Sequence, residues 1–147
     1  FIKRGQQPKL SLDTLPVFNR KIWGFKTGLT IIAGRTSQGK SALSLQIAYD
    51  LASQGHPVLF LSLEMGVESL IERLFCNVME IDNFEILTGK IMQYEDEWER
   101  FMEKMNIPLR LSCGIGKDFE EINQTLDLLE AKPEVIILDY IQAIRNV

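Results

Sequence analysis

The stretch "GRTSQGKS", Gly34 to Ser41, follows the apolar run "LTIIA" and fits the pattern G-x-x-x-x-G-K-[ST]. The two glycines let the backbone bend so that successive N–H groups turn inward toward an anion. Lys40 can reach β- and γ-phosphate oxygens, and the Ser41 hydroxyl can ligate Mg²⁺. The alternative is a flexible surface loop that matches by chance. The position between a strand-like and a helical pattern favours a phosphate-binding loop (P-loop, Walker A), with nucleotide contacts from Gly34, Arg35, Thr36, Ser37, Gln38, Gly39, Lys40, Ser41 and Ala42.

Short apolar runs and helical stripes alternate on both sides of this loop. Leu29–Ala33 is β-branched and apolar and predicts a buried strand, whereas Leu43, Ile47 and Leu51 recur at helical spacing. Such alternation is typical of an α/β domain with a mostly parallel sheet and helices on both faces. Further strands are predicted at "VLFLSL", "IPLRLS" and "VIIL", and further helices over 67–78, 98–105 (acidic and exposed) and 119–129.

Two acidic residues stand at the ends of predicted strands. Asp139 closes "VIILD" and Glu64 closes "VLFLSLE", and ligands of open α/β sheets bind outside the carboxyl ends of the strands. Asp139 is favoured as a Mg²⁺ partner of Ser41, acting through water, over an Asp that caps the next segment. Glu64 could polarise a water for attack on the γ-phosphate, or merely favour a helix start. Spacing alone does not separate these two alternatives.

Three further polar residues have mainly structural or solvent-facing interpretations. Gln142 could sense the γ-phosphate, but a solvent-facing side chain is the favoured interpretation. His56 in "QGHP" is predicted to be an exposed turn residue, and Arg73 to form a structural ion pair on the polar flank of its helix.

Composition restricts the class of protein. The 147 residues carry a net charge of −4, with 46% apolar and 24% charged residues. The negative charge removes the simplest argument for nucleic-acid binding, which usually needs a basic stripe. No apolar run is long enough to cross a bilayer, and no signal-peptide pattern opens the sequence. We therefore expect no membrane association. Cys76 and Cys113 lack metal-ligand spacing, so we expect buried or idle thiols in a reducing cytoplasm.

Three motifs in order resemble the RecA-like motor domain of the DnaB family of replicative helicases. They are "GRTSQGKSALSLQIA", "VLFLSLEM" and "VIILDYIQAIR", and the resemblance extends from Phe18 to Arg145. The resemblance implies a RecA-like P-loop NTPase fold. It also implies that Glu64 is the catalytic base and Asp139 the metal-side aspartate, acting with Lys40 on ATP and Mg²⁺. It includes Gln142 without giving it a role.

The resemblance also implies partners and domain limits. Family members assemble as homo-hexameric rings around single-stranded DNA, with ATP between subunits, and a primase and a helicase loader are candidate partners. We expect residues 1–17 to be a linker or N-terminal extension and residues 18–147 to be the N-terminal part of the ATPase core. The sensor strand, DNA-contacting loops and arginine finger that follow in the family are expected to be missing, as is the preceding helical domain. Because a finger contributes on the order of 10³–10⁵ in rate, the chain alone is predicted to bind ATP·Mg²⁺ weakly and hydrolyse it poorly.

Two other functions stay open on the sequence. One is a RecA- or RadA-like recombination or repair ATPase that forms filaments rather than closed rings. The other is a regulator of a helicase that senses nucleotide without hydrolysing it. The presence of Glu64 favours hydrolysis over sensing.

Overall fold

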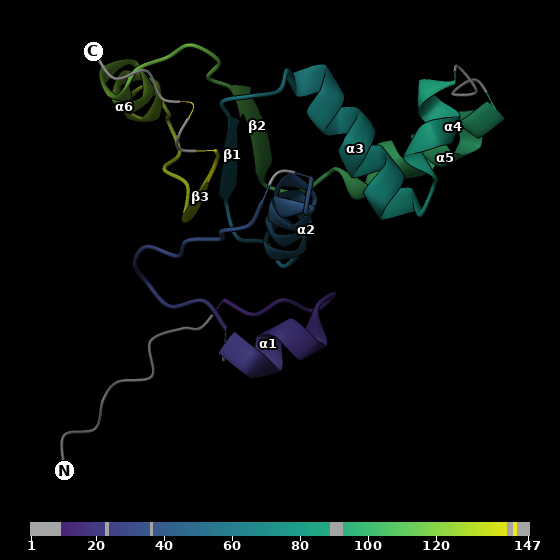
Figure 1. The fold of residues 1–147 in the computed structure, drawn as a ribbon, viewed down its shortest axis with the longest axis horizontal. Helices are drawn as coiled ribbons and strands as arrows, with labels where there is room; N and C mark the ends of the chain where they lie inside the picture. The colour runs from purple at the N-terminus through teal and green to yellow at the C-terminus, as the bar shows by residue number, and fades with distance from the viewer. Residues whose placement is uncertain (1–9, 23, 36, 89–92, 141–142, 144–147) are drawn as a thin grey trace.

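A three-stranded parallel sheet organises the molecule. The computed structural model describes residues 10–22, 24–35, 37–88, 93–140 and 143 (Figure 1). The strand order is β2-β1-β3, with β1 in the centre. In chain order the elements are α1 Pro16–Ile22, α2 Lys40–Ser53, β1 Val58–Ser62, α3 Val67–Met79, α4 Asn83–Leu87, α5 Glu95–Lys104, β2 Leu109–Cys113, α6 Phe119–Asp127 and β3 Val135–Asp139.

The register of the sheet places all three carboxyl ends at one edge. Ser62 of β1 is the register partner of Cys113 in β2 and of Asp139 in β3. Every residue of β1 is buried, as expected for a central strand covered on both faces. The strands predicted from "VLFLSL", "IPLRLS" and "VIIL" are therefore confirmed.

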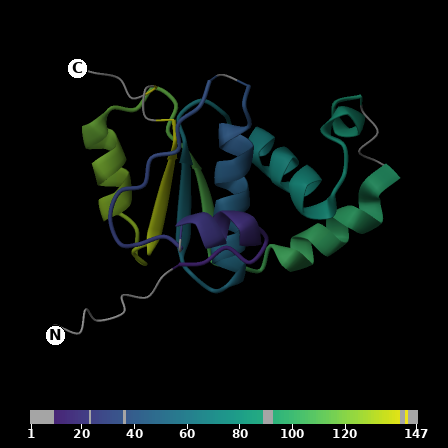
Figure 2. The same ribbon diagram turned by 60° about the horizontal axis from the view of Figure 1, so that its bottom comes forward.

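Helices cover both faces of the sheet. Figure 2 shows α2 and α6 on opposite sides of the strands. Side chains of a strand alternate between its faces, so Val58 and Phe60 join the core under α2, while Leu61 packs with Ile122 of α6. Each fully buried side chain of this kind stabilises the fold by about 1.5–3 kcal/mol. The predicted α/β class, with helices on both faces, is confirmed.

Helices α3, α4 and α5 extend away from the sheet on the α2 side (Figure 1). An aromatic cluster joins α3 to α5. The Phe75 ring lies 5.1 Å from that of Trp98 and 5.4 Å from that of Phe101, between centroids. The helix predicted over 98–105 is confirmed, but it is not wholly exposed, because Phe101 is 1% exposed. Most of the acidic residues of α5 are exposed, as predicted.

The strand predicted over Leu29–Ala33 is wrong. This segment has no strand structure, and Leu29 and Ile31 are 88% and 77% exposed. Only Ile32 packs against the core under α2. Among the described residues, β3 pairs with β1 alone. An apolar pattern reports the tendency of a segment to be buried, whereas a strand also needs a neighbour for its backbone groups.

The segment before α2 packs against that helix. Leu12 is 1% exposed, and Leu10 forms a backbone bridge with Phe25. The backbone N–H and the hydroxyl of Thr14 both donate to Asp50 Oδ2, at 3.0 and 3.1 Å. These contacts compensate the burial of the Asp50 carboxylate in α2. Helix α1 was not predicted from the sequence, and its seven residues carry no buried side chain. No helix of the described part is long and apolar enough to cross a membrane.

Candidate nucleotide-binding site

Polar groups of the glycine loop before α2 hydrogen-bond to one another. Lys40 Nζ donates to the Arg35 carbonyl at 3.0 Å, and the Arg35 N–H donates to Gln38 Oε1 at 2.9 Å. Ser37 adopts the left-handed conformation, with φ 62°. Thr36, one of the predicted contacts, lies outside the described residues. The lysine ammonium is thus held across the loop, close to the backbone that an anion would approach.

Helix α2 begins immediately after the second glycine. Gly39 is its N-cap, with φ 80° and ψ 18°, a conformation that strains residues with a Cβ. A glycine offers no side-chain oxygen to the first N–H groups, and no acidic residue occurs in the first turn. The positive end of this 14-residue helix has no side-chain cap and no acidic residue in its first turn. Such an end is suited to bind an anion. Ser41 lies in this first turn.

The two predicted acids lie at the carboxyl edge of the sheet, on neighbouring strands. Asp139 ends β3, and Glu64 follows β1 by two residues. The Leu63 N–H donates to the Asp139 carbonyl at 2.7 Å, which connects the segment before Glu64 directly to Asp139. Figure 2 shows the loop that leads into α2 at this same end of the sheet. The loop and both acids therefore share one edge.

The Asp139 side chain lies largely buried at this edge. The residue is 5% exposed, and its carboxylate forms no ion pair within the described ranges. Carboxylate oxygens are ligands that Mg²⁺ prefers, so Asp139 at the end of β3 fits a site for Mg²⁺. Across the described residues, no three His, Cys, Asp or Glu side chains group as a metal site. Such a set is not needed by Mg²⁺, which keeps several waters and binds with phosphates.

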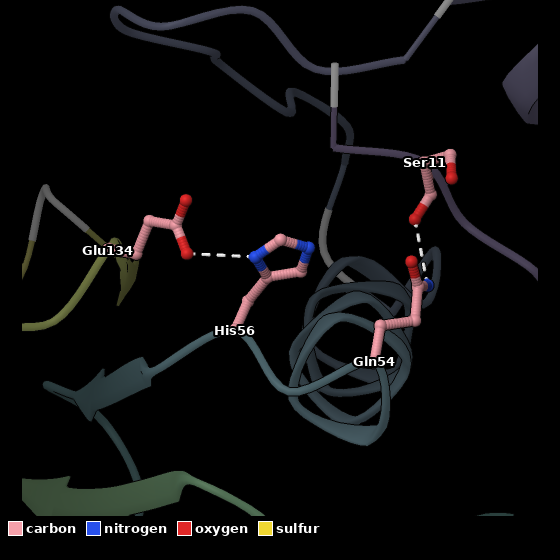
Figure 3. Close-up of polar contacts among 4 residues, drawn as sticks. All are labelled: Ser11, Gln54, His56 and Glu134. Atoms are coloured by element: carbon pink, nitrogen blue, oxygen red, sulfur yellow. Dashed lines mark hydrogen bonds and ion pairs between the residues drawn. The ribbon is translucent and has the colours of Figure 1, made fainter. Parts of the chain in front are cut away.

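The remaining predicted residues have mixed outcomes. Glu64 is exposed and accessible to water, whereas Gln142 lies outside the described residues. His56 is only partly exposed, and its Nδ1 lies 2.8 Å from Glu134 Oε2 (Figure 3). Arg73 forms no ion pair within the described part of the chain, so that prediction is not confirmed.

One residue of this edge was missed from the sequence. Ser62 is fully buried, and its hydroxyl accepts a hydrogen bond from the Met65 N–H at 2.9 Å. The available signal was a serine at the end of an otherwise apolar strand, three residues before a backbone N–H that needs a partner.

Neither cysteine forms a disulfide. Burial raises the pKa of the Cys76 thiol, and the nearby Glu72 carboxylate raises it further. The thiol therefore stays protonated at neutral pH, which makes it a poor nucleophile and metal ligand. Cys76 and Cys113 are both free, as expected.

A family model for the DnaB-like helicase C terminal domain matches residues 13–147. The chain belongs to this family. It is 31% identical over 136 residues to replicative DNA helicase DnaC of Bacillus subtilis (strain 168), covering 87% of this chain and 30% of that protein. The chain spans less than a third of the length of the curated relatives that it matches.

Solved structures share the fold. One, an ATPase domain, matches with a TM-score of 0.73 and 22% identity, covering 98% of this chain and 54% of that one. A DnaB-like replicative helicase, studied with its interactions with primase, matches with a TM-score of 0.72 and 22% identity. That match covers 96% of this chain and 35% of the other. The predicted resemblance to the DnaB family and its RecA-like ATPase fold is confirmed.

Proposed function

We propose that this DnaB-like domain binds and hydrolyses ATP and is the motor core of a replicative DNA helicase. One observation carries the proposal. The glycine loop, Glu64 and Asp139 lie at the same edge of the sheet, where the acids end or follow neighbouring strands. These groups can bind phosphates, a divalent cation and an attacking water, which are the requirements of phosphoryl transfer to water.

Nucleotide binding is assigned to the loop and the start of α2. The backbone N–H groups of Gly34–Ala42 and the positive end of α2 would surround the phosphates. Lys40 reaches across the loop to the Arg35 carbonyl at 3.0 Å. A γ-phosphate oxygen is a stronger partner than a carbonyl because it is ionised. Lys40 therefore exchanges or shares this partner when ATP binds.

Metal binding is assigned to Ser41 and Asp139. The Ser41 hydroxyl follows Lys40 in the first turn of α2, and the largely buried Asp139 ends β3. Mg²⁺ bound with ATP supplies neutralisation of the charge that develops on the phosphate oxygens. Asp139 would orient water ligands of that ion.

Water activation is assigned to Glu64. The residue follows β1 beside the end of β3 and is exposed, so a water molecule can reach its carboxylate. A carboxylate in this position accepts a proton from the water as the water attacks the γ-phosphate in line. Gln142 is a candidate sensor of the γ-phosphate, and only the sequence pattern supports this role.

Partners and domain limits follow from the family. The matched relative from Bacillus subtilis is a replicative DNA helicase, and a solved relative was studied with primase. We therefore propose single-stranded DNA as the track, a homo-hexameric ring as the assembly, and a primase and a loader as partners. Residues 1–17 would be a linker or N-terminal extension, and residues 18–147 the N-terminal part of the ATPase core. Family membership favours this function over a recombination or repair ATPase.

Replacement of the proposed base tests hydrolysis directly. In the full-length gene product, Glu64→Gln should lower kcat for ATP by about 10²–10⁴-fold, because general base catalysis contributes that much. Nucleotide affinity should change little, because the substitution leaves the loop intact. The measurement is steady-state phosphate release with and without single-stranded DNA. Glu68→Gln, at an exposed residue in the first turn of α3, is the matched control. Binding of ATP without hydrolysis by the unmodified protein would support the nucleotide sensor instead.

A further inference from the structure

Ser62 is a buried polar residue in a strand that otherwise buries apolar side chains. The other four residues of β1 are valine, leucine and phenylalanine, and all five are buried. Ser62 itself is 0% exposed. A hydroxyl in such a place is unfavourable unless it is hydrogen-bonded. Its partner is the Met65 N–H, which donates to Ser62 Oγ at 2.9 Å.

This hydrogen bond and a second one flank Glu64 on both sides. On the preceding side, the Leu63 N–H donates to the Asp139 carbonyl at 2.7 Å. On the following side, the Met65 N–H is held by the Ser62 hydroxyl. The N–H groups of the residues directly before and after Glu64 are therefore both hydrogen-bonded, and the Glu64 side chain is exposed. An exposed carboxylate thus extends from a turn whose backbone is held on both sides.

The end of β2 holds the same turn from the opposite side. The Gly114 N–H donates to the Ser62 carbonyl at 2.8 Å. A Cβ at Gly114 would lie 2.9 Å from Leu63 Cδ2 and 3.1 Å from Leu61 Cδ1, which is too close for any side chain without a shift. The turn after β1 is therefore fixed by both neighbouring strands, and Ser62 supplies the one side-chain contact among these bonds.

We infer that Ser62 is a positioning residue for ATP hydrolysis, which rests on the proposed role of Glu64 as the base. Its hydroxyl sets the backbone of the turn, and the turn sets where the Glu64 carboxylate meets the attacking water. A general base must come within about 2.6–3.2 Å of the group it deprotonates. A displacement of about 1 Å at a catalytic group can lower the rate by about 10²-fold. The hydroxyl does not touch the nucleotide in this role.

Ser62→Ala in the full-length gene product tests the inference. We expect kcat to fall by about tenfold, within the range that misplacement produces, while the Kd for ATP is unchanged. Ser53→Ala, at an exposed residue that ends α2, is the matched control and should leave both values unchanged. Ser62→Cys, which keeps the shape but is a weak acceptor, should also lower kcat and serves if the alanine variant does not fold.

The double variant separates positioning from a general structural effect. In the Glu64→Gln background, Ser62→Ala should cause no further loss of kcat, because the group that Ser62 positions is already absent. An equal loss in both backgrounds, or an unchanged kcat in Ser62→Ala alone, would overturn the inference and leave the proposed function standing. An unchanged kcat in Glu64→Gln alone would instead overturn the proposed function.

Discussion

The two edges of the sheet differ in where their polar groups find partners. At the amino edge, polar groups of the chain form hydrogen bonds with one another. His56 Nδ1 lies 2.8 Å from Glu134 Oε2, and Gln54 donates to the Ser11 carbonyl at 2.9 Å (Figure 3). The Pro57 carbonyl accepts from the Glu134 N–H at 2.8 Å. These contacts join the start of β1 to β3 and to the N-terminal segment.

At the carboxyl edge, the backbone groups of the turn are hydrogen-bonded and two acidic residues stand beside them. Leu63, Met65 and Gly114 all donate to neighbouring groups. The carboxylates of Glu64 and Asp139 form no ion pair within the described residues. A hydrogen-bonded backbone that presents acidic residues at the carboxyl ends of parallel strands is typical of a ligand site. The amino edge therefore maintains the fold, and the carboxyl edge is left for a ligand.

The largest effect is expected from Lys40→Ala. The variant loses its charge-assisted hydrogen bonds with the phosphates. Because such bonds are worth about 1.5–3 kcal/mol each, the loss of two should lower ATP affinity by more than about 100-fold. Titration with a fluorescent ATP analogue measures this. Lys104→Ala, in the last turn of α5, is the charge-matched control. Unchanged ATP affinity in Lys40→Ala would show that the loop does not bind the nucleotide.

Asp139→Asn should give an intermediate effect. The Mg²⁺ concentration needed for half-maximal nucleotide binding should rise by about tenfold, since groups that orient metal ligands typically contribute about 10–100-fold. Stability should change little, because asparagine keeps the shape and volume of this largely buried side chain. Magnesium titrations and thermal unfolding test the two parts, with Asp96→Asn on the exposed face of α5 as control. A loss of stability without a magnesium effect would make Asp139 a structural residue.

The smallest effect is expected from His56→Ala. Both partners of this pair are partly exposed, and pairs of this kind contribute about 0.2–1 kcal/mol at most. A double-mutant cycle with Glu134→Ala, followed by denaturant unfolding, measures the coupling. ATP affinity should not change. A fall in ATP affinity would contradict the assignment of the amino edge to the fold and the carboxyl edge to the ligand.

Local pattern was sufficient for most elements of the fold. Short apolar runs predicted β1, β2 and β3, and stripes at helical spacing predicted α2, α3, α5 and α6, because burial on a sheet or a helix face imposes those periods. The same reasoning failed at Leu29–Ala33. That segment is as apolar as β3, but it lacks a neighbouring strand among the described residues, and no local pattern reports the availability of a partner.

The amino-acid sequence was enough to establish the family and the chemical groups of the candidate site. The glycine spacing of Gly34–Ser41 and the two acids after apolar runs are local features, and their meaning follows from the residue types and the order of the motifs. How these groups are held was visible only in the folded chain. The bond from Leu63 to Asp139, the Ser62 contact beside Glu64 and the burial of the Asp139 carboxylate depend on how the strands pair. Strand register relates residues far apart in the chain, and it follows from the packing of the whole core rather than from any one segment.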